Sequence, residues 1–64
     1  MKRKKLLQHL TAHGCEVAGE GAKHTRVRNP ANGAKSFVPR HPEIKSGTAK
    51  GICKQLGVPV PRGD

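Results

Sequence analysis

Glycines and prolines divide this chain into five short segments, and this division limits the folds open to it more than any other feature. The clearest turn signals are Gly14, residues 19–21, "NPANG" at 29–33, Pro39 and Gly57. Each interval between them has room for one short helix or one strand. The 64 residues make one small domain that buries only roughly 60% of its unfolded surface, so we expect no deep substrate pocket.

The segment "KRKKLLQHLTAHG" has the apolar spacing of a helix. Leu6, Leu7 and Leu10 form one stripe, and Gly14 is placed to end the helix. Its first turn carries four basic residues at 2–5, where the helix dipole disfavours positive charge. Helix stability therefore does not explain this cluster, which is either a solvated start or a set of phosphate contacts.

A second helix is predicted over "SGTAKGICKQLG". Apolar residues recur there at i, i+3, i+4 and i+7, and they are Ala49, Ile52, Cys53 and Leu56. Ser46 or Thr48 can cap its start, Gly57 can end it, and Pro59 forbids its continuation. The remainder, "VPVPRGD", is expected to be extended and loose.

Three segments between the helices have the features of strands. "CEVAG" alternates, with Cys15 and Val17 on one side, and "HTRVR" alternates too. "KSFVP" ends at Pro39, and the Asn-Gly pair in "NPANG" is a hairpin signal. We therefore expect a meander of three antiparallel strands.

The order helix, strand, strand, strand, helix predicts a small α+β domain. Two amphipathic helices can cover one face of the three-stranded sheet and leave the other face open. This is the layout of a double-stranded-RNA-binding-domain-like fold. We assign residues 1–59 to this single domain and 60–64 to an extended tail.

The strong basic charge limits the classes of partner. Thirteen Lys and Arg oppose four acids, which gives a formal charge of +9. Such a charge favours a polyanionic partner, namely nucleic acid, an anionic membrane or an acidic protein. A membrane is disfavoured because no apolar run approaches the roughly 20 residues of a spanning helix, and no apolar signal segment follows the basic start. We expect a soluble, cytoplasmic protein.

His24 is the main candidate for chemistry. If Thr25 and Val27 face the helices, then His24, Arg26 and Arg28 emerge together on the open face. An imidazole can take a proton from a ribose 2′-hydroxyl or give one to a leaving oxygen, and arginines can bind the phosphate. That chemistry needs no metal. The alternative is that His24 is only a phosphate contact.

The other groups of candidate functional residues are less complete. His9 and His13 have a metal-binding spacing, but only Cys15 is near them, so surface roles are favoured over a metal site. His41 lies between two prolines and either lines the surface of His24 or fills a loop. Cys15 and Cys53 are interpreted as small buried residues, with a single disulfide as the alternative. The sequence contains no P-loop, carboxylate dyad or Ser-His-Asp set.

Three stretches in order resemble the HicA-type toxins of bacterial toxin–antitoxin pairs. They are "LLQHLTAHGCEV", "GAKHTRVRNPANG" and "VPRHPEIKSGTAKGICKQLGV", and the resemblance extends over about residues 5–59. It implies a small, metal-independent endoribonuclease that cleaves mRNA and arrests translation, with His24 as the catalytic residue. It also implies a HicB-type antitoxin that covers the active surface and commonly carries a DNA-binding part.

Two positions depart from the common pattern of that family. Many members have Gly-Ser-His where this chain has Ala22-Lys23-His24, and many have an aromatic residue where Cys15 stands. Neither change removes the proton-transfer group, and Lys23 adds a cation near the phosphate. We expect RNA contacts, without metal or cofactor, from Lys23, Arg26, Arg28, Lys4, Lys5 and Arg40.

Two other functions stay open at this point. One is a non-catalytic RNA-binding module, which shares the fold and charge but needs no histidine. Because the chain has one Phe and no Tyr or Trp, such a module would favour backbone contacts over base stacking. The other is a structural or regulatory basic protein that binds DNA as well as RNA.

Overall fold

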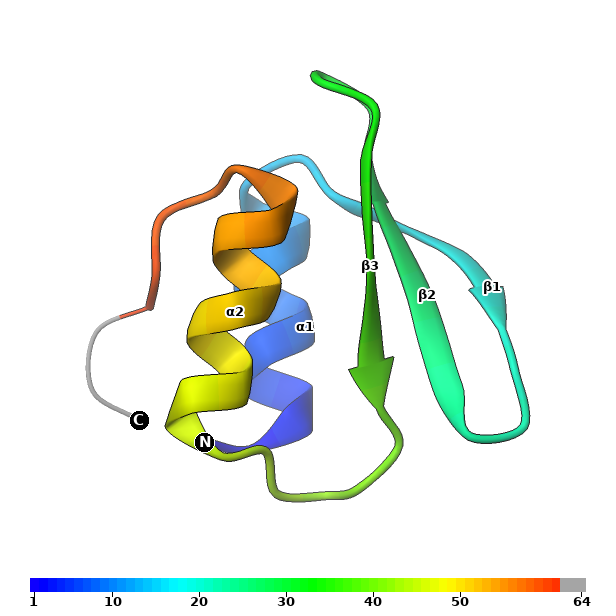
Figure 1. Cartoon of the computed structure of the whole chain (residues 1–64), viewed down its shortest axis with the longest axis vertical. Coiled ribbons are helices and arrows are strands. Elements are labelled where there is room, and N and C mark those ends of the chain that lie inside the picture. Colours follow the sequence, from blue (N-terminus) through cyan, green and yellow to red (C-terminus); the bar gives the residue numbers. More distant parts are fainter. Residues whose placement is uncertain (62–64) are drawn as a thin grey trace.

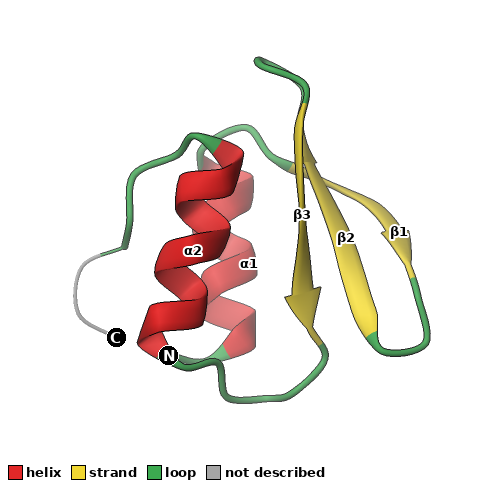
Figure 2. Cartoon of the chain, viewed as in Figure 1, coloured by secondary structure: helices red, strands yellow, loops and turns green. Residues whose placement is uncertain are grey.

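The computed structural model describes residues 1–61 and has the predicted order of elements (Figure 1). They are α1 (Arg3–Ala12), β1 (Glu16–Glu20), β2 (His24–Asn29), β3 (Ala34–Pro39) and α2 (Ser46–Leu56). The strands form an antiparallel sheet in the order β1-β2-β3, and both helices lie on one side of it (Figure 2). The predicted α+β class and meander are therefore confirmed.

The end of α1 follows the sequence prediction. Gly14 has a φ of 88°, and its N–H donates to the Thr11 carbonyl at 3.0 Å. The next N–H, of Cys15, donates to the Leu10 carbonyl at 2.9 Å. These two bonds satisfy carbonyls that the helix leaves free, and they turn Cys15 back into the core.

The start of α2 differs from the prediction. Neither Ser46 nor Thr48 caps the helix, because Ser46 is already the first helical residue and the N-cap position is Lys45, which makes no side-chain cap bond. The end agrees with the prediction, since Gly57 adopts a left-handed conformation with φ 74°.

The segment after α2 is also more ordered than predicted. Val58 is buried, Val60 packs half-buried against the core, and His9 Nε2 is 2.6 Å from the Pro59 carbonyl oxygen. The expected loose tail is therefore wrong for residues 58–60, because apolar contacts hold them. Residues 62–64 of that tail lie outside the described part of the chain.

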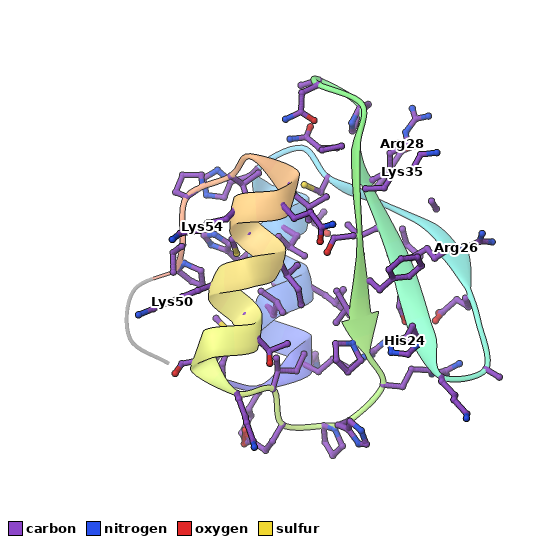
Figure 3. The ribbon with its side chains drawn as sticks, in the orientation of Figure 1. His24, Arg26, Arg28, Lys35, Lys50 and Lys54 are labelled. Carbon is purple, nitrogen blue, oxygen red and sulfur yellow. The ribbon has the colours of Figure 1, made fainter. Side chains whose placement is uncertain are left out.

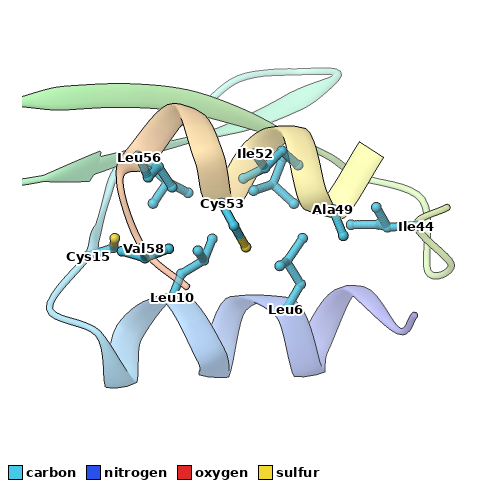
Figure 4. Close-up of a cluster of buried hydrophobic side chains, with 11 residues drawn as sticks. Leu6, Leu10, Cys15, Ile44, Ala49, Ile52, Cys53, Leu56 and Val58 are labelled. Carbon is cyan, nitrogen blue, oxygen red and sulfur yellow. The ribbon is translucent and has the colours of Figure 1, made fainter. Parts of the chain in front are cut away.

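The core lies between the helices and one face of the sheet. Leu6 and Leu10 project from α1 toward Cys53 on α2 (Figure 4). The sheet contributes Val27 and Val38. The remaining members of the cluster are Cys15, Ile44, Ala49, Ile52, Leu56 and Val58. The stripe predicted for α2 is therefore confirmed.

The helices leave the edge strand β1 uncovered. Val17 is paired with the buried Val27 and so points to the helix side, yet 52% of its surface is exposed. A bulge between Val17 and Gly19 ends the simple alternation predicted for this strand. The outer part of the sheet therefore has little packing on either face.

The β2–β3 turn is bound to the end of α2. The side-chain amide of the buried Asn29 donates to the Leu56 carbonyl at 2.8 Å, and that of Asn32 donates to the same oxygen at 3.1 Å. The Asn29 side-chain oxygen accepts from the Ala31 N–H at 3.1 Å. These bonds fix where the hairpin lies against α2.

Candidate active site

His24 begins β2, directly after a tight turn at residues 21–23. The Gly21 N–H donates to the His24 carbonyl at 2.8 Å, which closes the turn. The alternating burial of β2 leaves His24 exposed, opposite Pro39 of β3. The imidazole is therefore accessible on the face of the sheet that the helices do not cover.

A partly buried network of hydrogen bonds supports the strand directly after His24. The Thr25 side chain is 1% exposed, and its hydroxyl donates to Glu20 at 2.8 Å while accepting from Arg3. Arg3 also donates through Nε to the Pro39 carbonyl at 3.1 Å. Arg3 of the basic cluster thus joins α1 to the ends of β2 and β3, a role that the sequence did not indicate.

Arg26 and Arg28 share the open face with His24 (Figure 3). Arg28 Nε lies 3.6 Å from a carboxylate oxygen of Glu16, and both side chains are about half exposed, so this pair is weak. Within residues 1–61, Arg26 has no ion-pair partner, and its guanidinium lies over Gly19. Arg26 therefore offers an uncompensated charge two residues from the imidazole.

Arg40 joins this group from a distant part of the sequence. Its Nη1 donates to the Gly21 carbonyl at 3.1 Å, which places Arg40 against the turn that carries Lys23. Both side chains are exposed. The structure therefore brings a cation from the segment after β3 to the turn before His24, and the RNA contact predicted for Arg40 stays a prediction.

The arrangement is an exposed surface with an imidazole beside several cations. The side chains of His24, Arg26 and Arg28 emerge at alternate positions of one strand. They therefore form a row along β2 and do not enclose a pocket. An extended polyanion can bind along such a face, whereas a small molecule would find little to enclose it.

The family model described as "HicA toxin of bacterial toxin-antitoxin" matches residues 3–58. The chain belongs to the HicA toxin family. The crystal structure of the E. coli HicAB toxin-antitoxin complex contains a chain with a similar fold, at a TM-score of 0.73 and 40% sequence identity. The match covers 88% of this chain and 96% of that chain. No curated protein sequence matches.

In this HicA toxin, Lys4 and Lys5 lie apart from the open face. Lys4 lines a groove along α1 with Leu7, Gln8 and Thr11, and Lys5 lines a depression that includes Glu43. Both lysines belong to the helical layer. The structure therefore does not place them on the face that carries His24, and their predicted RNA contacts stay a prediction.

Sequence reasoning assigned no role in the site of this HicA toxin to Phe37. It is 58% exposed and lies opposite Arg26 in the register of β2 and β3. Its ring is 6.1 Å from the His24 ring, centroid to centroid, in an edge-on arrangement. The sequence carries no signal that separates Phe37 from the adjacent apolar Val38, and the burial of Ser36 and Val38 in the structure places Phe37 on the open face.

The remaining histidines are at α1 and in the loop after β3. The rings of His9, in α1, and His13, directly after it, are 4.5 Å apart, and His41 lines a hollow with Ile44 and Thr48. Within the described residues, no three His, Cys, Asp or Glu side chains gather to hold a metal ion. None of the helices there is long and apolar enough to cross a membrane.

The two cysteines are free and buried. Burial raises the pKa of the Cys15 thiol and that of the Cys53 thiol, and the nearby Cys15 raises the pKa of Cys53 further. Both side chains belong to the apolar core. The interpretation of these residues as small buried side chains is therefore confirmed, and the alternative disulfide is not present.

Proposed function

We propose that this HicA toxin is an endoribonuclease that cleaves mRNA in the cytoplasm, with His24 as the general acid/base. The single observation that carries the proposal is the exposed imidazole on the open face, two residues from the uncompensated Arg26. A titratable ring in that position can exchange protons with a bound phosphodiester. Membership of the HicA family supports the choice of RNA as the substrate.

The proposed reaction moves one proton at each oxygen. His24 takes the proton from a ribose 2′-hydroxyl while O2′ forms a bond to phosphorus and the bond from phosphorus to O5′ breaks. The leaving O5′ takes a proton from the imidazolium or from water. The products are a 2′,3′-cyclic phosphate and a 5′-hydroxyl end, so atoms and charge balance without an added metal.

The neighbouring cations bind the phosphate. Arg26 can donate two parallel hydrogen bonds to phosphate oxygens and offset the charge that develops in the transition state. Arg28 extends the basic surface along the strand, while Lys23 and Arg40 supply charge at the turn before His24. Lys4 and Lys5 are proposed to contact more distant phosphates from α1.

The proposed protein partner is a HicB-type antitoxin that covers the open face. Support comes from the E. coli HicAB complex, whose similar chain is part of a toxin-antitoxin assembly. The formal charge of +9 favours a partner with an acidic surface. Covering His24 and Arg26 would exclude RNA and keep the toxin inactive.

The test compares wild type with His24→Ala, for RNA cleavage in vitro and for growth arrest on induced expression. We expect the variant to abolish both without unfolding the protein, because the His24 side chain is exposed. His13→Ala is the matched control, since His13 is exposed just after the end of α1 and its replacement should leave cleavage unchanged. A 2′-deoxy substitution at the cleaved position should block the reaction.

Two results would contradict this function. Cleavage by His24→Ala at the wild-type rate would remove the histidine from the mechanism. Wild-type protein that retards RNA on a gel, in a salt-dependent way, without producing new ends would favour a non-catalytic RNA-binding module.

A further inference from the structure

Phe37 is exposed in a chain that has few large apolar side chains for its core. It is the only residue among Phe, Tyr and Trp in the sequence, and 58% of its surface is accessible. The smaller Val38 occupies the buried position beside it in β3. The fold thus displays its largest apolar ring, and burial of apolar surface does not explain that position.

The surroundings of Phe37 are basic. Arg26 is its direct partner across the strands, and Lys35 lies two positions away on the same face, opposite Arg28. The His24 ring is 6.1 Å away, centroid to centroid, with the two rings at 71°. The Phe37 ring therefore lies near the imidazole, on a sheet face that also carries Arg26, Arg28 and Lys35.

We propose that Phe37 is a stacking platform for a nucleobase of the RNA strand, beside the phosphate bound by Arg26 and the ribose that faces His24. This inference rests on the proposed function and adds a base-binding subsite to it. Aromatic side chains on open sheet faces stack bases in other RNA-binding folds, because every base has a flat π-face. A single ring on a face that carries cations can then orient one nucleotide while the cations hold its backbone.

Exposure alone does not distinguish Phe37 from Val17. Val17 is exposed to a similar extent, 52%, on the same sheet, but it belongs to β1 and points to the helix side. Isolated exposed apolar residues are common on proteins. Phe37 differs because it is planar and stands among the charges that would bind a polyanion. That combination matches a single-stranded nucleic acid.

The first test places a fluorophore at the proposed subsite. The chain has no Trp or Tyr, so Phe37→Trp introduces a single reporter. In a His24→Ala background, which prevents cleavage, titration with a short RNA should change the emission of this tryptophan. Val17→Trp in the same background is the matched control on the opposite face and should report no change. Equal responses from the two reporters would overturn the proposal.

The second test separates bases from phosphates. In the His24→Ala background, we expect Phe37→Leu to bind the RNA about five- to hundredfold more weakly, and Phe37→Tyr to bind it normally. An abasic strand with the same phosphates should bind equally well to Phe37→Leu, to Phe37→Tyr and to the protein that keeps Phe37, all in the His24→Ala background. Unchanged RNA affinity in Phe37→Leu would overturn the proposal. This holds also if Phe37→Leu weakens the binding of the antitoxin.

Failure here is distinguishable from failure of the proposed function. If Phe37→Leu binds RNA normally while the protein with native His24 still cleaves it, the stacking subsite is wrong and the nuclease assignment stands. If the protein with native His24 does not cleave RNA but Phe37→Leu loses affinity for base-containing strands, the subsite stands without the nuclease activity.

Discussion

The guanidinium of Arg26 lies over the backbone of Gly19, in space that any other residue would fill. A Cβ built on Gly19 would be 2.8 Å from Arg26 Nη2 and 3.2 Å from Nε. The two residues are partners in the register of β1 and β2. Glycine at this position therefore lets the guanidinium lie on the open face, at a fixed distance along the strand from His24.

Gly19→Ala should move Arg26 and weaken RNA binding without unfolding the protein. The added methyl meets the far end of a flexible side chain, so the cost in stability is small, within about 0.5 kcal/mol. Displacing a charge-assisted phosphate contact should lower RNA affinity up to about tenfold. Binding of a non-cleavable RNA and thermal unfolding measure the two effects. Unchanged affinity would show that Gly19 does not position Arg26.

Gly51→Ala should stabilise the protein and leave RNA binding unchanged. Gly51 is exposed within α2, and a Cβ there would have no atom within 4 Å. Ala is favoured over Gly in a helix interior by about 1 kcal/mol, which corresponds to a rise in Tm of roughly 4–8 °C for a domain of this size. Calorimetry measures this rise in Tm. The same variant is the control for Gly19→Ala, and a fall in Tm would mean that α2 needs glycine there.

Asn29→Ala should destabilise the fold by about 1–3 kcal/mol, because it removes a buried donor to the Leu56 carbonyl and an acceptor for the Ala31 N–H. Asn32→Ala is the matched comparison. It removes the longer bond to the same carbonyl from an exposed residue, so its effect should be smaller. Urea denaturation gives the free energy of unfolding of both variants. Equal losses of stability would show that the burial of Asn29 does not make its hydrogen bonds more stabilising than that of Asn32.

Alkaline pH should destabilise the protein through its buried thiols. The folded state raises the pKa of Cys15 and that of Cys53 above their ordinary value of 9.0, so folding favours the neutral thiols. Their contribution to stability is complete below about pH 9 and is lost as the pH rises through the folded-state values, by at most about 1.4 kcal/mol per pH unit for each thiol.

The measurement for the thiols is the free energy of unfolding between pH 8 and pH 10.5, the window in which an unperturbed thiol and then lysine titrate. Cys53→Ala lacks one thiol and should show a shallower decline than wild type over the same range. Equal slopes in the two proteins would assign the decline to groups other than Cys53.

Much of the fold was predictable because local spacing is enough to define the faces of an element. The i, i+3, i+4, i+7 stripe of α2 and the alternation of β2 each have one apolar side, so the buried and exposed residues followed directly. The same alternation put His24, Arg26 and Arg28 on one face, as the structure confirms. The roles of these residues in catalysis and RNA binding stay predictions.

The sequence by itself determined the five elements, their order and the basic face of β2, since these depend on residues close together in the chain. Only the tertiary structure decided which of Phe37 and Val38 is buried, because both are apolar and adjacent in β3. It also decided that Arg3 bonds to Thr25 and that Arg40 reaches Gly21. Such contacts depend on how the helices and strands pack against each other, and no local spacing encodes that.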